Sequence, residues 1–259
     1  MSSHAEKSMT STPPAQPASS PTRSAAALAG ARVMVVGGSS GIGLAVAGAA
    51  RDAGAEVIVA SRRPERATTE LDGIRSVAID VTDDASVAQA FADLDRLDHL
   101  VCTAANSFPP GLFRGPTQEV RDLMESKFWG QYRCARTAAP LLSDQASITF
   151  TSGIRSRRPL MGSGAFTVVN MAVEGMARAL AIELGPIRVN AIAPGTVVTP
   201  VHDVLDPEVR ERRLAGAARQ STVGRVGQAH EVAEIYLTCM TNAFLSGAVI
   251  DIDGGGMLA

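Results

Sequence analysis

The chain has 259 residues, of which 46% are apolar and 19% charged, and its formal net charge at pH 7 is −2. This balance is typical of one globular domain and indicates neither a nucleic-acid partner nor an anionic membrane. No apolar run reaches the length that spans a membrane, so we expect no membrane partner. The three cysteines and four histidines form no Cys-x-x-Cys or His-x-x-x-His pair, so we expect reduced thiols in a cytoplasmic protein and no metal site.

Residues 1–27 are rich in Ser, Pro, Thr and Ala and predict a disordered tail, not a signal peptide. The remainder, 28–259, alternates apolar strand patterns with helical patterns. We expect strands at 32–36, 56–60, 77–79, 99–102, 147–151, 187–192 and 248–251. We expect helices at 42–53, 64–71, 83–91, 117–142, 165–184, 207–218 and 230–240, the fourth of them irregular near Gly130.

Continuously apolar strands that alternate with helices predict a parallel sheet covered on both faces. Right-handed crossovers then give a single doubly wound α/β domain of the Rossmann type, with a seven-stranded parallel sheet. Ligands of such a sheet bind at the carboxyl ends of the strands, near the point where the strand order reverses. The sequence contains no internal repeat and no linker to a second domain.

A glycine-rich turn lies where the first strand meets the first helix. Gly37 permits a tight turn, Gly41 lets the backbone approach a phosphate, and Gly43 lets the helix pack closely on the sheet. Backbone N–H groups at the start of the helix would meet the pyrophosphate of a dinucleotide, and Ser39 and Ser40 can add hydroxyl donors. The turn therefore predicts a nucleotide site, and a tight turn without a ligand is the alternative.

The same residues also spell Gly-x-Ser-x-Gly, the turn that carries the nucleophile of many hydrolases. In that interpretation Ser39 is the nucleophile, and its base is His202 or His230. Such a turn normally follows several strands, whereas this one follows the first. Neither histidine has an acidic partner that the sequence identifies.

Further segments along the chain add to the glycine turn. With them, the region from Ala31 to the C-terminus resembles the short-chain dehydrogenase/reductase family. Two segments match the family only in part: the turn has Val36 at the usual threonine position, and Cys102-Thr103-Ala104-Ala105 keeps one residue of the usual Asn-Asn-Ala-Gly. The other matching segments are Asp80-Val81, Arg188 to Gly195, Thr199-Pro200 and Asp253-Gly254-Gly255. The resemblance implies a nicotinamide cofactor and a small-molecule substrate. It also implies a homodimer or homotetramer formed through the helix 165–184 and the helix before it.

The residues after the second strand bear on the choice of cofactor. An acidic residue there would hold the 2′-hydroxyl of NAD, but the chain has Ser61 followed by Arg62 and Arg63. A guanidinium suits a 2′-phosphate, so we expect NADP(H) in preference to NAD(H), with solvated surface arginines as the alternative. The predicted cofactor contacts are Gly37, Ser39, Ser40, Gly41, Ile42, Ser61, Arg62, Arg63, Asp80, Val81, Thr103, Ala104, Ala105, Asn170, Pro194, Gly195, Val197 and Thr199.

The catalytic positions of the resembled family do not match. Its Ser, Tyr and Lys fall on Gly153, Phe166 and Asn170, and the chain contains no Tyr-x-x-x-Lys. Phe166 has no exchangeable proton and cannot be a general acid, a loss that typically costs ~10²–10⁴ in rate. The family's helix asparagine falls on Lys127. We therefore name Ser152 and Lys127 as candidate catalytic residues, with Thr167 or a bound water as other proton donors and a surface lysine as the alternative for Lys127.

Two further features stay open. Arg155, Arg157 and Arg158 follow the fifth strand and would recognise an acidic substrate or simply be solvated. The segment 199–221 is expected to form a substrate lid. Three functions are compatible with these patterns: an NADP-dependent oxidoreductase with a rearranged proton donor, a cofactor-binding homologue without ordinary redox activity that serves as a sensor, scaffold or non-redox catalyst, and a serine hydrolase.

Overall fold

The computed structural model describes residues 27–104, 111–113 and 115–259, so the predicted tail lies outside the described residues except for Ala27. A seven-stranded sheet runs through the domain in the order β3-β2-β1-β4-β5-β6-β9, and every neighbouring pair is parallel. This confirms the predicted doubly wound sheet. The strands are β1 (Arg32–Val36), β2 (Glu56–Ser61), β3 (Arg75–Ala78), β4 (Leu97–Cys102), β5 (Leu142–Thr151), β6 (Arg188–Pro194) and β9 (Val249–Ile252).

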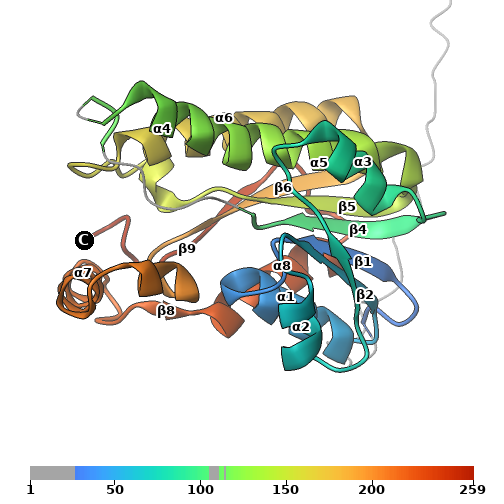
Figure 1. Cartoon of the computed structure of the whole chain (residues 1–259), viewed down its shortest axis with the longest axis horizontal. Helices are drawn as coiled ribbons and strands as arrows, with labels where there is room; N and C mark the ends of the chain where they lie inside the picture. Colours follow the sequence, from blue (N-terminus) through green and yellow to red (C-terminus); the bar gives the residue numbers. More distant parts are fainter. Residues whose placement is uncertain (1–26, 105–110, 114) are drawn as a thin grey trace, which may run out of the picture.

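Helices cover both faces of the sheet (Figure 1). One face carries α3 (Asp84–Phe91), α4 (Thr117–Leu123), α5 (Gly130–Ala138) and α6 (Gly164–Glu183), and the other carries α1 (Gly41–Asp52) and α8 (Ala229–Thr241), with α2 (Glu65–Glu70) beside them. Each face has its own apolar core. Alternate residues of one strand belong to opposite cores, as Met34 and Val35 of β1 do, because side chains alternate across a strand.

The strand order reverses between β1 and β4. The chain leaves β1, builds β2 and β3 on one side, and then crosses back to place β4 on the other side of β1. The segments after β1 and β4 are therefore neighbours, and Thr103 N donates a hydrogen bond to Val36 O over 2.8 Å. This is the place at which doubly wound sheets bind ligands, and it contains the glycine turn.

Among the described residues one helix, α6, is long and apolar enough to meet the length and hydropathy criterion for a membrane span, although Glu174 and Arg178 interrupt its apolar residues. Its apolar character has a local explanation, since Val169, Val173 and Ala177 are fully buried. The last two of these residues belong to the core between α6 and the sheet. The polar residues Asn170 and Glu174 on the same helix are also buried, which a purely apolar span would not require.

The region predicted as one helix, 117–142, differs in detail. A π-helix, η1 (Met124–Trp129), separates α4 from α5, and a 3-10 turn, η2 (Ala139–Leu141), ends the helical stretch where β5 begins at Leu142. The irregularity lies just before Gly130, where a side chain would meet Val81 Cγ2 at 2.7 Å. The extra residue in the π-turn changes which side chains face inward, and Lys127 becomes buried.

Other differences are at element ends. β5 starts at Leu142 instead of 147 because Leu142 pairs with Leu97 ahead of a register shift. β3 starts at Arg75, which pairs with Ile58, instead of 77. Periodicity could not predict the shortest elements, which are the strand pair β7 (Val197–Val198) and β8 (Gly227–Gln228) and the turns η3 (Ile154–Ser156) and η4 (Pro200–Val204). The exposed helix α7 (Pro207–Arg219) ends one residue later than predicted.

Candidate functional site

The glycine turn is packed to backbone distance on the segment after β4. Gly37 has φ +85°, and a Cβ there would lie 2.6 Å from Ala104 N. A Cβ on Gly43 would fall against Gly37 O and 2.5 Å from Thr103 Oγ1. The Thr103 hydroxyl donates to Val36 O over 3.0 Å, so it helps to close the turn. Both glycines are thus required by the packing of the turn.

The start of α1 presents backbone N–H groups. Ser40 is the exposed N-cap, and among the described residues no side chain caps this end and no acidic residue lies in the first turn. Gly41 has φ +55°, and the Thr199 side chain lies 3.1 Å from the position of its missing Cβ. The structure therefore brings Thr199, Gly41 and the amide groups of the first turn together. A twelve-residue helix with an uncapped N-terminus suits an anionic group.

The carboxyl ends of β2 and β3 form the far end of this site. Ser61 is buried, and its Oγ has no hydrogen-bond partner within the described ranges. Arg62 and Arg63 follow and are exposed. The pKa of the Asp80 carboxyl is lowered by hydrogen bonds from Thr82 N and Oγ1 and further by the positive charge of Arg62. Arg62 and Asp80 therefore lie close together at the edge of the site.

The remaining predicted cofactor contacts lie at the ends of β4 and β6. Gly195 N donates to Ile252 O over 2.9 Å, and a Cβ on Gly195 would meet Asp253 Cα at 2.8 Å, so the glycine is needed for packing against the segment after β9. Val197 is buried in β7. Predicted contact Ala105 lies outside the described residues. Val81 packs against Gly130, so its side chain supports the π-helix.

Lys127 is buried in η1 and faces the end of β5. Its Nζ donates to Ser152 O over 2.9 Å and lies 5.9 Å from the centroid of the Phe166 ring. Burial lowers the pKa of its ammonium group from 10.5 to about 8. An amine with this pKa exchanges its proton near neutral pH, and a buried, perturbed lysine in a ligand site is typical of functional groups. Lys127 is not the surface lysine that the sequence left open.

The number of lysines in the chain sets Lys127 apart from its other cations. The sequence has only two lysines, Lys7 and Lys127, against 22 arginines. Nearly every other cation of the chain is therefore arginine, whose pKa is too high to release a proton at neutral pH. Lys127 is the single lysine of residues 28–259, and it lies in the candidate site.

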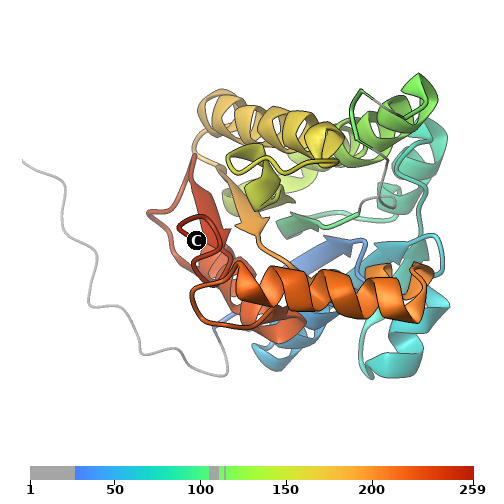
Figure 2. The same cartoon turned by 90° about the vertical axis from the view of Figure 1, so that its left-hand side faces the viewer.

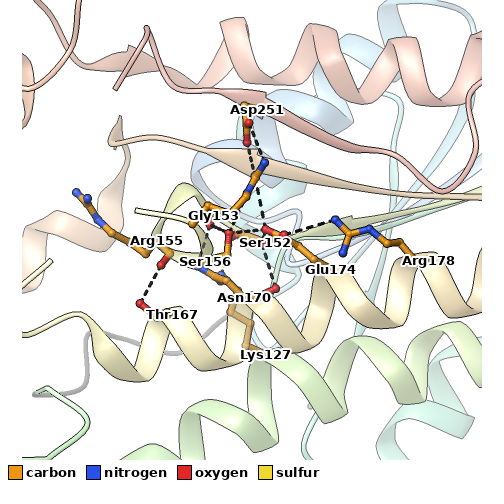
Figure 3. Close-up of polar contacts among 11 residues, drawn as sticks. Lys127, Ser152, Gly153, Arg155, Ser156, Thr167, Asn170, Glu174, Arg178 and Asp251 are labelled. Atoms are coloured by element: carbon orange, nitrogen blue, oxygen red, sulfur yellow. Dashed lines mark hydrogen bonds and ion pairs between the residues drawn. The ribbon is translucent and has the colours of Figure 1, made fainter. Parts of the chain in front are cut away.

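The Ser152 hydroxyl points away from Lys127 (Figure 3). It donates to Glu174 Oε1 over 2.8 Å, and Ser156 Oγ donates to the same oxygen over 2.5 Å. The guanidinium groups of Arg157 and Arg178 lie 3.6 Å and 4.0 Å from the Glu174 carboxylate. The structure thus uses Ser152 to anchor the end of β5 on α6, and the contact of Ser152 with Lys127 is through its carbonyl oxygen.

Asn170 lies one turn after Phe166 on α6. Its Nδ2 donates to Gly153 O over 3.2 Å, and its Oδ1 is buried with no hydrogen-bond partner in the part of the chain that the structure describes. A Cβ on Gly153 would lie 2.9 Å from Asn170 Nδ2, so glycine at 153 leaves room for the amide. Sequence reasoning missed Glu174 and Ser156, although a glutamate on so apolar a helix was a visible signal.

The hydrolase interpretation of Ser39 finds no support. His202 is buried, and its Nε2 lies 3.1 Å from Val197 O. His230 is exposed on α8. Three side-chain oxygens of the described residues are buried without a hydrogen-bond partner: Thr149 Oγ1 in β5, Ser61 Oγ at the end of β2, and Asn170 Oδ1 on α6. The last two lie, like the uncapped start of α1, near the carboxyl ends of the strands. Hydroxyl groups of two riboses would satisfy these two oxygens and a pyrophosphate would satisfy the helix, so the residues fit a nicotinamide dinucleotide.

Comparison with known proteins agrees with this geometry. The family model of enoyl-(acyl carrier protein) reductases matches residues 36–256. The short-chain dehydrogenase/reductase ucsE of an Acremonium species is 34% identical, over 92% of this chain and 99% of that protein. The short-chain dehydrogenase/reductase malC of Malbranchea aurantiaca is 31% identical, over 91% of this chain and 98% of that protein.

Two solved structures extend the agreement. A small-chain dehydrogenase in complex with NADPH is 30% identical with a TM-score of 0.79, over 89% of this chain and all of that one. The MalC reductase/Diels–Alderase of Malbranchea aurantiaca is 29% identical with a TM-score of 0.82, over 91% of this chain and 99% of that one. The chain belongs to the short-chain dehydrogenase/reductase family.

Proposed function

We propose that the protein is an NADP(H)-dependent oxidoreductase that acts on a carbonyl or alcohol group of a small molecule, with Lys127 as the proton donor. The observation that carries this proposal is the buried Lys127 ammonium, whose pKa is about 8, beside the Phe166 ring. The bound cofactor would supply the hydride. The residues of the chain would orient the substrate and move the proton that the reaction also needs.

The proton step follows from the chemistry of Lys127. An ammonium group has three donors, and one of them is occupied by Ser152 O. The face of the Phe166 ring attracts the charged form, while burial favours loss of the proton. In reduction, an N–H of Lys127 would give its proton to the substrate oxygen, directly or through one water, and leave a neutral amine that reprotonates from solvent.

The choice between NADP and NAD rests on Arg62. It follows the buried Ser61, and its charge acts on Asp80 at the edge of the site. The solved relative in complex with NADPH supports the same choice. Asn170 Oδ1 and the first turn of α1 would hold the rest of the cofactor.

Replacement of Arg62 by alanine is expected to weaken NADPH binding roughly 10-fold and leave NADH binding unchanged, because one charge-assisted contact to the 2′-phosphate is lost. The measurement is a fluorescence titration of both nucleotides. Arg66→Ala, which removes the same charge from exposed α2, is the control and should change neither value. Equal loss for NADH and NADPH would contradict the assignment of Arg62 to the 2′-phosphate.

The oxidoreductase proposal is tested by NADPH consumption with a panel of aldehydes and ketones, after a titration has shown saturable NADPH binding. We expect consumption that depends on the carbonyl compound and on the protein. Saturable binding without consumption across the panel would contradict this function. Failure to bind either nicotinamide nucleotide would contradict every cofactor-dependent function.

A second candidate is a cofactor-binding protein that catalyses a non-redox step. It is favoured by Phe166 and Asn170, and a relative bears the name reductase/Diels–Alderase. The discriminating variant is Gly153→Ser with Phe166→Tyr and Asn170→Lys. Gly153 and Asn170 must change together, since a side chain at 153 would press on the Asn170 amide. Carbonyl reduction that appears only in this triple variant would contradict the oxidoreductase function of the natural protein and favour the second candidate.

A further inference from the structure

A pocket lies beside the proposed reaction site. It is formed by η3, the segment after β6, the end of α7 and the segment after β9, and its lining includes Arg155, Arg158, Thr196, Gln220, Arg225 and Asp253. Figure 2 faces this end of the molecule and shows α7 lying across it. Two lining residues, Ile154 and Thr196, directly follow Gly153 and Gly195 of the proposed site. The pocket is therefore adjacent along the chain to two residues of the proposed site.

The three arginines after β5 have different partners. Arg157 forms an ion pair with Asp251, in which Nη1 lies 2.9 Å from Oδ2, and it also approaches Glu174. Arg155 has no Asp or Glu side chain within 4.0 Å among the described residues, and it donates one long hydrogen bond, 3.4 Å, to Arg158 O. Figure 3 shows the Arg155 guanidinium pointing away from both Glu174 and Asp251.

The other charged residues of the pocket do not neutralise Arg155. Arg158 donates to Gln220 O and Ala259 O. Arg225 forms an ion pair with Glu231. The Asp253 carboxylate accepts hydrogen bonds from Gly255 N and Met257 N, over 2.9 and 2.7 Å, and so holds the segment after β9 in place.

Arg155 is therefore a half-buried cation that forms no ion pair among the described residues, although the Asp253 carboxylate also lines the pocket. Its pKa is lowered by burial and further by the positive charges of Arg158 and Arg213. A partly buried charge without a counter-charge is costly, and an anion bound between these groups would relieve both the burial and the repulsion. A planar guanidinium binds carboxylate and phosphate oxygens with two parallel hydrogen bonds.

We infer that Arg155, with Arg158 adding charge, binds an anionic group, a carboxylate or a phosphate, of the substrate in this pocket. This inference rests on the proposed function, since it names the substrate class for that reaction site. It also selects the first of the two interpretations that the sequence left open for these arginines. The neutralised Arg157 keeps a structural role.

Binding without turnover gives the first arm of the test. Benzoate, phenyl phosphate and methyl benzoate are titrated by calorimetry into the protein with NADP. We expect one or both anions to bind and the neutral ester not to, and the stronger anion identifies the group. Arg155→Met should weaken the anion roughly 10-fold or more, whereas Arg155→Lys, which keeps the charge, should weaken it less. Arg212→Met, which removes an arginine that pairs with Glu208 on α7, is the control and should bind as the wild type does.

Turnover gives the second arm. The rates of NADPH consumption with 4-formylbenzoate, 4-formylphenyl phosphate and methyl 4-formylbenzoate are compared. We expect a kcat/KM at least roughly 10-fold higher for one anionic aldehyde in the wild type and loss of this preference in Arg155→Met. Because Arg155→Met can fail to fold, its free energy of unfolding in urea is measured. Arg158→Met is a second variant, in which we expect a smaller loss of the preference for the anionic aldehyde.

The outcomes separate the two proposals. Anion binding that depends on Arg155, with no turnover of any aldehyde, would support the inference and contradict the oxidoreductase. Turnover of all three aldehydes at equal rates in the wild type and in Arg155→Met would contradict the inference and leave the oxidoreductase proposal standing. Failure of both anions to bind, or equal binding by the wild type and Arg155→Met, would overturn the inference as well.

Discussion

Lys127→Met is expected to lower the rate of carbonyl reduction roughly 10²–10⁴-fold, the usual effect of removing a general acid. Methionine has a similar volume but no exchangeable proton, and the contacts of the cofactor site do not involve Lys127. NADPH affinity should therefore stay within about a factor of two, which calorimetry would check. A variant that binds NADPH and retains the wild-type rate would contradict the role of Lys127.

The same substitution should not destabilise the protein. Burial lowers the pKa of Lys127 from 10.5 to about 8. This drop corresponds to a cost of folding on the order of 3 kcal/mol below pH 8, which the variant would not carry. Against this, Ser152 O loses its donor, at about 1–3 kcal/mol. We expect a free energy of unfolding in urea that is unchanged or higher at pH 7.

Stability should also respond to pH through Lys127. Between pH 8 and 10.5 the unfolded chain binds more protons at this residue than the folded chain, so its contribution makes the folded state more stable as pH rises through this window. Lys127→Met should lack this contribution. With only two lysines in the chain, selective ¹³C labelling of lysine would follow Lys127 directly by NMR, and its midpoint should lie near 8.

Gly43→Ala is expected to abolish tight NADPH binding and to cost roughly 1–3 kcal/mol of stability. The added Cβ would meet Gly37 O in the glycine turn and Thr103 Oγ1 in the segment after β4. The backbone at Gly37 and the Thr103 side chain would have to move, and the first-turn amides would move with the turn. A nucleotide titration and urea unfolding measure the two effects.

Gly48→Ala is the matched control on the same helix. Its Cβ would meet Leu71 Cδ2 at 3.5 Å, an ordinary contact, and alanine favours a helix over glycine by about 0.5–1 kcal/mol. This variant should bind NADPH as the wild type does and be slightly more stable. If the two alanine variants bound NADPH equally well, the turn would not be the pyrophosphate site.

The sheet was largely predictable, and the residues proposed for the cofactor site could be assigned to one edge of it, because both depend on local patterns. Apolar strands, glycines at a turn and the residues after each strand all lie close together in sequence, so Gly37, Ser61 and Asp80 could be assigned to one edge of the sheet. The hydrogen bond from the Thr103 hydroxyl to Val36 O, which closes the glycine turn, was not predictable from the sequence, and the contact of Thr103 with the cofactor stays a prediction. Ala105 lies outside the described residues, and the homo-oligomer and cytoplasmic location stay predictions.

The reaction site was less predictable because it depends on contacts between distant segments. The π-turn that buries Lys127 requires the close approach of Gly130 to Val81, which no periodicity reveals. The Ser152 hydroxyl donates a hydrogen bond to the carboxylate of Glu174, which lies 22 positions away in the sequence. Whether Arg155 or Arg157 is neutralised depends on Asp251, which the fold brings to the end of β5.

The most direct test of the account is the pH dependence of kcat/KM for NADPH-dependent reduction, in the wild type and in Lys127→Met. If Lys127 donates the proton, the wild-type value is constant below pH 8 and falls about 10-fold per pH unit above it, because the ammonium form is lost. The residual activity of the variant should then show no such fall. A wild-type profile that stays flat from pH 6 to 10, or the same fall in both proteins, would contradict Lys127 as the proton donor.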